Sequence, residues 1–297
     1  MLIYIQMNNE EENQYLHQLK NIIEKGYEGD DRTGVGTKSL FGTQMRFNLE
    51  NNSFPLLTTK RMFTKGIVEE LLWFLRGDTN SKNLENKGVS IWKGNSCRET
   101  LNNLGFTDRE VGDCGPIYGF NFRHYGGNYK DCDTNYTNCG YDQVKEVLRL
   151  IKEDPTSRRI IINLWNPLTL KQTVLPPCHV LYQFKVIGTK LSCSLYQRSG
   201  DMGLGIPFNI ASASLLTIIF AKLTNLEPYE LIHSIGDSHI YLDHEEALKQ
   251  QILRTPYKFP KLDIIDRGQS KVEDFILEDF VISDYTCYKK IKLKMAV

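Results

Sequence analysis

Apolar side chains recur at helical spacing in five stretches of the chain. Between residues 10 and 25, Tyr15, Leu19 and Ile22 lie three or four positions apart, and Gly26 ends the pattern. The same periodicity predicts helices over residues 66–76, 142–152, 210–223 and 243–253. The longest uncharged apolar run, residues 210–221, is shorter than the roughly 20 residues of a membrane-spanning helix. We therefore expect a buried core helix there and no membrane partner.

Shorter segments have the pattern of β-strands. Alternating apolar and polar residues predict strands over 41–49, 180–185 and 190–197, and the apolar run 160–165 predicts a buried strand. Further strands are expected near 257–266, and a turn over 236–241. Residues 78–140 are rich in Asn, Gly and Asp, which predicts a loop-rich region. No repeat, low-complexity tract or linker divides the chain, so we expect one domain over residues 1–297.

Composition narrows the classes of protein. The 297 residues include 36 Lys plus Arg and 36 Asp plus Glu, and this zero net charge argues against a general nucleic-acid binder. The seven cysteines are odd in number and lack CxxC spacing, which favours reduced thiols. The N-terminus has no basic flank of the kind that a secretory signal carries. These features predict a cytoplasmic protein, with the nucleus as the alternative.

The densest set of reactive side chains lies between residues 175 and 209. Pro176 and Pro177 keep the backbone extended and present the thiol of Cys178 outside any helix. The segments 197–201 and 205–209 then add a guanidinium, a hydroxyl, a carboxylate and an amide in a span that is expected to alternate strand and loop. This inventory suits an enzyme that attacks a small anionic substrate covalently.

Three other polar features each have two interpretations. Glu69 and Glu70 could both lie at the solvent end of an apolar helix, or one could have a raised pKa and transfer protons. Arg158 and Arg159 could be a solvated strand end or a fork for a phosphate. The glycine loop that presents Arg32 lacks the Walker spacing, so it is a surface turn or an anion contact.

Ten motifs occur in the order found in one enzyme family. They are Asp30–Gly34, Thr58–Arg61, Glu69–Phe74, Gly115–Gly119, Ser157–Ile161, Pro176–His179, Gln197–Asp201, Gly205–Ser212, Gly236–Tyr241 and the ending Met295–Val297. Together they resemble the folate-dependent thymidylate synthases. The likeness runs from about residue 13 to the end of the chain, and a monofunctional enzyme is expected.

The resemblance implies reductive methylation of dUMP to dTMP. The carbon and the hydride would come from 5,10-methylenetetrahydrofolate, which leaves as dihydrofolate, and no metal is implied. Carbon 5 of uracil is a poor nucleophile, so the Cys178 thiolate would first add to carbon 6. The implied fold is an α+β domain with a large mixed sheet, covered by helices on one face and forming a homodimer interface with the other. Residues 1–12 would be a flexible extension, and residues 286–297 a mobile tail that closes the site.

The same resemblance implies the roles of individual residues, with His179 only supporting. Proton transfer falls to Glu70 and Tyr118, and Arg198 and Asn209 complete the catalytic set. The implied dUMP contacts are Arg32, Arg158, Arg159, Gln197, Arg198, Ser199, Asp201, Asn209, His239 and Tyr241, with Arg158 and Arg159 donated across the dimer interface. The implied folate contacts are Lys60, Ile91, Trp92, Asp201, Leu204, Gly205, Phe208 and Ala296.

Several positions depart from the family pattern. Lys93, Thr64, Phe122 and Ala213 replace the usual residues and bear on the folate pocket.

Two rival functions are also compatible with these motifs. A pyrimidine nucleotide hydroxymethylase of the same superfamily is one rival, although Asn209 favours uracil as the base. An RNA-binding regulator that retains catalysis is the other, and the zero net charge gives it no support.

Overall fold

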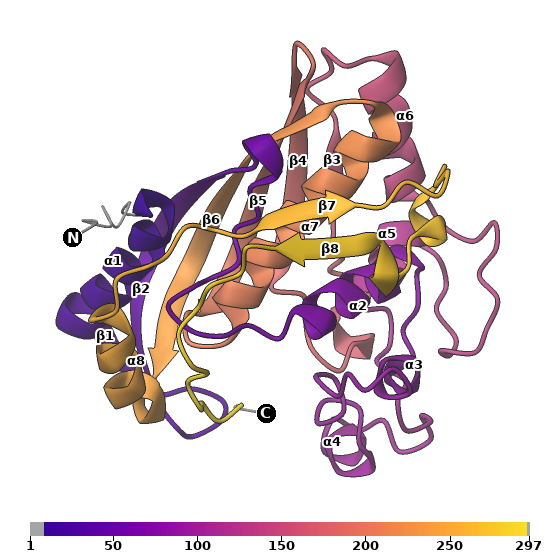
Figure 1. The fold of residues 1–297 in the computed structure, drawn as a ribbon. Helices are drawn as coiled ribbons and strands as arrows, with labels where there is room; N and C mark the ends of the chain where they lie inside the picture. The colour runs from indigo at the N-terminus through magenta and orange to yellow at the C-terminus, as the bar shows by residue number, and fades with distance from the viewer. Residues whose placement is uncertain (1–8, 296–297) are drawn as a thin grey trace.

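A six-stranded mixed sheet forms one layer of the molecule, and helices pack in front of it in the view of Figure 1. The computed structural model describes residues 9–295. The strand order is β1-β2-β6-β5-β4-β3, and every neighbouring pair is antiparallel except β5 and β6, which are parallel. The strands are β1 (Tyr27–Gly29), β2 (Thr37–Asn48), β3 (Ile161–Asn163), β4 (His179–Ile187), β5 (Lys190–Asp201) and β6 (Glu227–Tyr241). A separate pair, β7 (Lys261–Ile264) and β8 (Phe280–Ser283), lies apart from it.

Helices pack on this sheet and on one another, which confirms the predicted α+β class. α7 lies against β5 and β6, α2 against α7, and α1 against β2 (Figure 1). The helices are α1 (Glu10–Lys25), α2 (Thr64–Leu75), α3 (Ser81–Glu85), α4 (Arg98–Asn103), α5 (Tyr118–Arg123), α6 (Gln143–Glu153), α7 (Gly205–Thr224) and α8 (Glu245–Ile252). The short 3-10 turns are η1 (Glu50–Asn52), η2 (Leu170–Gln172), η3 (Leu242–His244), η4 (Val272–Asp274) and η5 (Leu277–Asp279).

α7 is the central helix of the domain and is longer than predicted. It begins at Gly205 rather than at residue 210, and Asn225 ends it in the left-handed conformation, with φ of 54°. By length and composition this helix could cross a membrane, but 83% of its most apolar stretch is buried inside the domain. It is therefore a core helix, as the sequence indicated, although the argument from its length does not hold.

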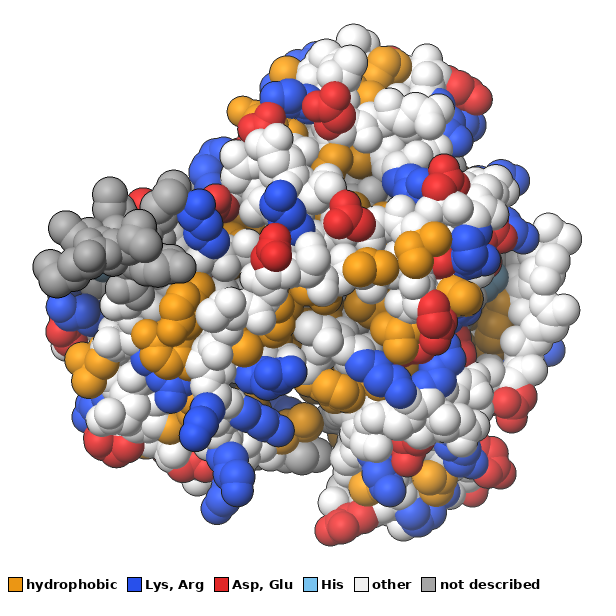
Figure 2. Space-filling view, in the orientation of Figure 1, with side chains coloured by type: hydrophobic (Ala, Val, Ile, Leu, Met, Phe, Trp, Pro, Cys, Tyr) orange, Lys and Arg blue, Asp and Glu red, His pale blue; other side chains and the backbone are white. Residues whose placement is uncertain are grey.

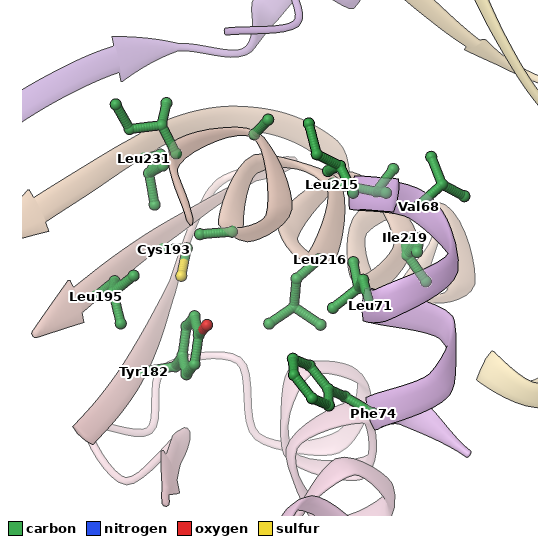
Figure 3. Close-up of a cluster of buried hydrophobic side chains, with 14 of the residues drawn as sticks. Val68, Leu71, Phe74, Tyr182, Cys193, Leu195, Leu215, Leu216, Ile219 and Leu231 are labelled. Carbon is green, nitrogen blue, oxygen red and sulfur yellow. The ribbon is translucent and has the colours of Figure 1, made fainter. Parts of the chain in front are cut away.

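The core fills the space between the sheet and α7 and α2 (Figure 3). Leu195 and Leu231 project from the sheet toward Leu215 and Leu216 of α7, and Leu71 of α2 closes the cluster. These side chains are at most 2% exposed. Each fully buried leucine contributes roughly 1.5–3 kcal/mol relative to an exposed one, so this layer holds the sheet and both helices in fixed register.

α1 is tied into the domain from its first turn. Asn9 caps it by accepting a hydrogen bond from the Glu12 backbone N–H, and the Asn9 amide donates to the carbonyl of Tyr257. Glu12 is fully buried and accepts hydrogen bonds from the backbone and hydroxyl groups of Thr58 and Thr59. The predicted flexible extension over residues 1–12 is therefore wrong for residues 9–12. Residues 1–8 lie outside the described part of the chain.

One further prediction needs correction. Residues 236–241 are not a turn: they form the end of β6, which pairs with β2 as far as Tyr241 and with β5 as far as His239. Local composition indicated a turn there, whereas the neighbouring strands supply the partners that make the segment regular. Residues 78–140 are rich in loops, as predicted, with the short helices α3, α4 and α5 between them.

The C-terminal segment passes beside Thr58, one of the partners of Glu12. The Tyr288 backbone N–H donates to the carbonyl of Thr58, and His244 Nε2 lies 2.8 Å from the carbonyl of Lys294. Lys289, Lys290, Lys292 and Lys294 are exposed. Basic side chains gather on the lower part of the face shown in Figure 2, over the region where the C-terminal residues run, and a hollow opens beside them. The prediction that residues 286–297 move to close the site stays a prediction.

Candidate active site

Cys178 lies at the end of an extended segment, immediately before β4. Its backbone N–H donates to the hydroxyl oxygen of Tyr118 at 2.6 Å, and its carbonyl accepts from the backbone N–H of Arg198 at 2.9 Å. The Arg198 guanidinium donates to the carbonyls of Pro177 and Pro176, both at 2.9 Å. The two prolines thus fix the extended backbone, and Arg198 and Tyr118 clamp it from two sides.

The thiol of Cys178 has a cation beside it in a dry environment. Arg198 Nη2 lies 3.8 Å from Sγ, and the guanidinium also lies over the ring of Trp165, 5.5 Å from its centroid. Burial raises the pKa of the Cys178 thiol, whereas the positive charges of Arg198 and Arg32 oppose that rise. Burial has the larger effect, so the thiol is held protonated beside the group best placed to stabilise its thiolate.

Glu69 and Glu70 have different environments, and the interpretation that both lie at the solvent end of α2 is wrong. Glu69 is 5% exposed and pairs with Lys87 at 2.6 Å. Glu70 accepts a hydrogen bond from the indole N–H of Trp92 at 2.8 Å. Burial raises the pKa of Glu70 to about 7, and the Trp92 hydrogen bond only partly opposes this. A carboxyl group with this pKa can both give and take a proton near neutrality.

Aromatic rings join Glu70 to the nucleophile. Tyr118 packs against Phe74, with ring centroids 4.8 Å apart, and against Trp92 at 6.2 Å. The negative charge of Glu70 contributes to the raised pKa of Tyr118, where burial is the main cause. Glu70 and Tyr118, the two groups expected to transfer protons, thus lie beside the same aromatic side chains, and Tyr118 connects them to the backbone of Cys178.

Asn209 lies in the second turn of α7, so its predicted place in a loop is wrong, yet its side chain faces the other candidates. Its Oδ1 accepts a hydrogen bond from Gln197 Nε2 at 2.9 Å. His179, buried beside it, has its pKa lowered to about 4 by burial, with the Asn209 side chain opposing the shift. His179 Nδ1 lies 2.8 Å from the hydroxyl of Tyr182. A neutral His179 suits the supporting role predicted for it.

The residues expected at the sugar and phosphate lie at the same ends of β5 and β6. His239 and Tyr241 lie on β6 with ring centroids 5.6 Å apart, and His239 Nδ1 is 2.8 Å from Asp237 Oδ1. Arg32 is exposed on the loop between β1 and β2, where its charge acts on Cys178 and Tyr241. Asp31 accepts bonds from the backbone N–H groups of Thr33 and Gly36, so this loop has a defined turn.

Most of the residues predicted at the folate lie at or near the start of α7, whereas Trp92 lies against α2 and Tyr118. Asp201 ends β5 and accepts from the Gly203 backbone N–H at 2.7 Å. Lys60 is 5% exposed and donates to the Gly203 carbonyl; burial lowers its pKa to about 8, which the nearby Asp201 opposes. The other candidates are partly buried, namely Ile91, Leu204, Gly205 and Phe208, and Trp92 is 6% exposed. Ala296 lies outside the described residues.

Arg158 and Arg159 are not part of this assembly within one chain. Both are exposed ahead of β3, at the edge of the sheet, and within residues 9–295 neither forms an ion pair. Ser199 takes part through its backbone carbonyl, which accepts from Gln197. Two contributors are missing from the predicted site: Trp165, which stacks on Arg198, and His233, which contacts Gln197. Neither belongs to a recognisable motif, so only the fold identifies them.

The α+β fold places an arginine beside a cysteine thiol, together with a carboxyl group whose pKa is about 7, and this arrangement suits the class of enzymes that attack a substrate covalently. The family model of thymidylate synthase matches residues 13–297, and the chain belongs to that family. Human thymidylate synthase is 54% identical over 284 residues, covering 96% of this chain and 90% of its own length. Thymidylate synthase of Saccharomyces cerevisiae is 52% identical over 299 residues, covering 97% and 98%. A bifunctional dihydrofolate reductase-thymidylate synthase of Paramecium tetraurelia is 57% identical over 97% of this chain, which spans 62% of that relative.

Proposed function

We propose that this thymidylate synthase converts dUMP to dTMP with 5,10-methylenetetrahydrofolate as the co-substrate. The observation that carries the proposal is the placement of the Cys178 thiol against Arg198, with Tyr118 bonded to its backbone. When bound, the folate supplies a one-carbon unit and a hydride. The apolar side chains at Ile91, Leu204 and Phe208 suit its ring system, and the exposed lysines near the C-terminus suit its carboxylates.

Cys178 is the nucleophile. Its thiolate adds to carbon 6 of uracil, and the electron pair of the 5,6 double bond moves onto carbon 5 and the carbonyl oxygen at position 4. Arg198 lowers the cost of the thiolate by its charge, an effect that is stronger in a buried site than in water. The sulfur is expelled again once the transferred carbon has been reduced, so the enzyme returns to its starting state.

Glu70 and Tyr118 handle the protons of the reaction. The proton on carbon 5 must leave after the one-carbon unit is attached, and the developing charge on the oxygen at position 4 needs a donor. Glu70, with a pKa of about 7, can serve both needs through ordered water. Tyr118 remains protonated because burial holds its pKa far above neutrality, so it acts as a donor and a positioning group.

Different residues hold the base, the sugar and the phosphate of the nucleotide. Asn209 reads the base, His239 and Tyr241 contact the sugar hydroxyl, and Arg32, Arg198 and Ser199 hold the phosphate. Arg158 and Arg159 complete the phosphate site from a second subunit, which makes the active form a homodimer. Their exposure at the sheet edge supports this arrangement, because each is free to reach a neighbouring chain.

A direct assay tests the proposal. Dihydrofolate formation is followed by absorbance with dUMP and methylenetetrahydrofolate, for the wild type beside Cys178→Ser. We expect turnover by the wild type and essentially none by the variant, since the serine hydroxyl is a much weaker nucleophile at pH 7. A 5-fluoro analogue of dUMP should form an adduct at Cys178. An inactive wild type, an active Cys178→Ser, or an adduct at Cys193 would contradict the assignment.

The same assay separates the rival chemistry. A hydroxymethylase would form 5-hydroxymethyl product without dihydrofolate, so product analysis by mass distinguishes the two. A reducing compartment, the cytoplasm or the nucleus, suits the protein because all seven cysteines are free. Fractionation of cells that express a tagged chain tests that placement.

A further inference from the structure

A buried hydrogen-bonded chain runs from the core to the side chain of Asn209. His233, in the middle of β6, is fully buried, and its Nε2 lies 2.8 Å from Gln197 Oε1. Gln197, on the neighbouring strand β5, is 2% exposed and donates from Nε2 to Ser199 O and to Asn209 Oδ1, both at 2.9 Å. This series of hydrogen bonds therefore ends at Asn209, the residue that is expected to contact the base.

The direction of every bond in this chain follows from one backbone group. The carbonyl of Ser199 can only accept, so the NH₂ group of Gln197 must face it, and the same NH₂ group faces Asn209. The Gln197 oxygen then faces His233, which must carry its proton on Nε2. Burial lowers the pKa of His233 to about 3, so the ring is neutral. Its Nδ1 has no partner among residues 9–295, which agrees with an unprotonated nitrogen there.

We propose that His233 is a positioning residue: acting through Gln197, it fixes the Asn209 amide in the orientation that accepts uracil and rejects cytosine. This inference rests on the proposed function, in which Asn209 contacts the base. The Asn209 oxygen, which faces Gln197 and also interacts with His179, presents the acceptor for the N3–H of uracil, and the Asn209 NH₂ can donate to the oxygen at position 4.

Cytosine presents the opposite pattern, an acceptor at N3 and an amino group at position 4. To bind it, the Asn209 amide would have to turn over and place its NH₂ against the NH₂ of Gln197. Gln197 cannot turn to relieve that clash, because Ser199 holds its amino end and His233 holds its oxygen. Two buried donors facing each other without an acceptor are costly, so the orientation of Gln197 becomes a preference for uracil.

The first test compares the dissociation constants of dUMP and dCMP by calorimetry. In His233→Phe the Gln197 oxygen loses its donor, and we expect the preference for dUMP over dCMP to fall about tenfold, the effect of one buried hydrogen bond. The KM for the folate should stay the same. His233→Gln can place an amide N–H near the lost Nε2–H and should retain most of the preference.

A double-mutant cycle separates positioning from stability. If His233 acts only through Gln197, adding His233→Phe to Gln197→Met lowers the preference no further than Gln197→Met alone. Leu231→Val, a core change on the same strand, serves as the control for lost packing and should leave the preference unchanged. A folded His233→Phe with the wild-type preference, or an additional fall in the double variant, would overturn the inference. A wild type that binds neither nucleotide would instead count against the proposed function.

Discussion

At the scale of single residues, the structure gives the physical difference between two neighbouring glutamates that only the family resemblance had told apart. Glu69 is neutralised by Lys87, whereas Glu70 is half-buried with a single neutral donor, Trp92. A carboxylate that is buried without a cation shifts its pKa upward, because burial disfavours the charged form. The result is a pKa of about 7 for Glu70, and the Trp92 N–H keeps it from rising further.

Trp92→Phe should therefore raise the pKa of Glu70. The indole N–H favours the ionised carboxylate, so removing it favours the protonated form. A hydrogen bond to a charged group is worth roughly 1.5–3 kcal/mol, and one pKa unit corresponds to about 1.4 kcal/mol, which gives a rise of about one to two units. The inflection near pH 7 in the pH dependence of kcat/KM for dUMP should move to higher pH by that amount.

Trp73→Phe is the matched control for this change. Trp73 neighbours Trp92, with ring centroids 5.9 Å apart, and is 3% exposed, yet its indole nitrogen has no partner among the described residues. The control loses the same atoms without removing a hydrogen bond to Glu70. An equal shift of the inflection in both variants, or a shift to lower pH in Trp92→Phe, would contradict the explanation.

At the scale of elements, one buried carboxylate joins α1 to the segment that carries Lys60. Glu12→Ala would leave the backbone N–H groups of Thr58 and Thr59 buried without their acceptor. We expect a loss of about 3 kcal/mol in the free energy of unfolding, since each unsatisfied buried group costs roughly 1–3 kcal/mol. Urea unfolding at one fixed protein concentration measures it. Glu24→Ala, which removes an exposed partner of Lys20 on the same helix, should change stability by at most about 0.5 kcal/mol. Similar losses in both variants would refute the explanation.

The elements also show where prediction from sequence succeeds and where it stops. α1 and α6 are found because their apolar faces recur at helical spacing and their caps are local. The first turn of α7 is missed because Pro207 reads as a helix breaker. Backbone N–H groups in the first turn of a helix have no intrahelical acceptor, so a proline there removes no hydrogen bond and the helix tolerates it. The end of β6 is missed because its strand partners, β2 and β5, are distant in sequence.

At the scale of the whole molecule, the site is assembled from segments that no local pattern connects. Cys178 precedes β4, Tyr118 begins α5 and Asn209 lies in α7, and the fold brings them around one buried wall. The family resemblance supplied these residues as candidates, because their motifs survive in order. The resemblance could not supply the hydrogen bond between Tyr118 and the backbone of Cys178, or the hydrogen bonds that lead from His233 to Asn209, because these depend on three-dimensional contacts.

The proposed exchange of arginines between subunits makes a prediction about mixtures of inactive enzymes. Cys178→Ser lacks the nucleophile, and the double variant Arg158→Ala, Arg159→Ala lacks the donated phosphate contacts, so each homodimer should be nearly inactive at low dUMP. In a hybrid dimer, one site combines an intact Cys178 with intact arginines from the other subunit. Random reassociation of equal amounts gives half hybrids with one working site of two, so activity should recover to about a quarter of the wild type.

The recovery must depend on subunit exchange for this explanation to hold. The two variants are mixed after mild denaturation and refolding, and also mixed without it, and dihydrofolate formation is measured in both samples. If Arg158 and Arg159 served the site of their own chain, each hybrid site would lack either the thiol or the arginines, and no activity would return. Because these side chains are exposed and unpaired within residues 9–295, a recovery confined to the refolded mixture would assign them to the site of the neighbouring chain.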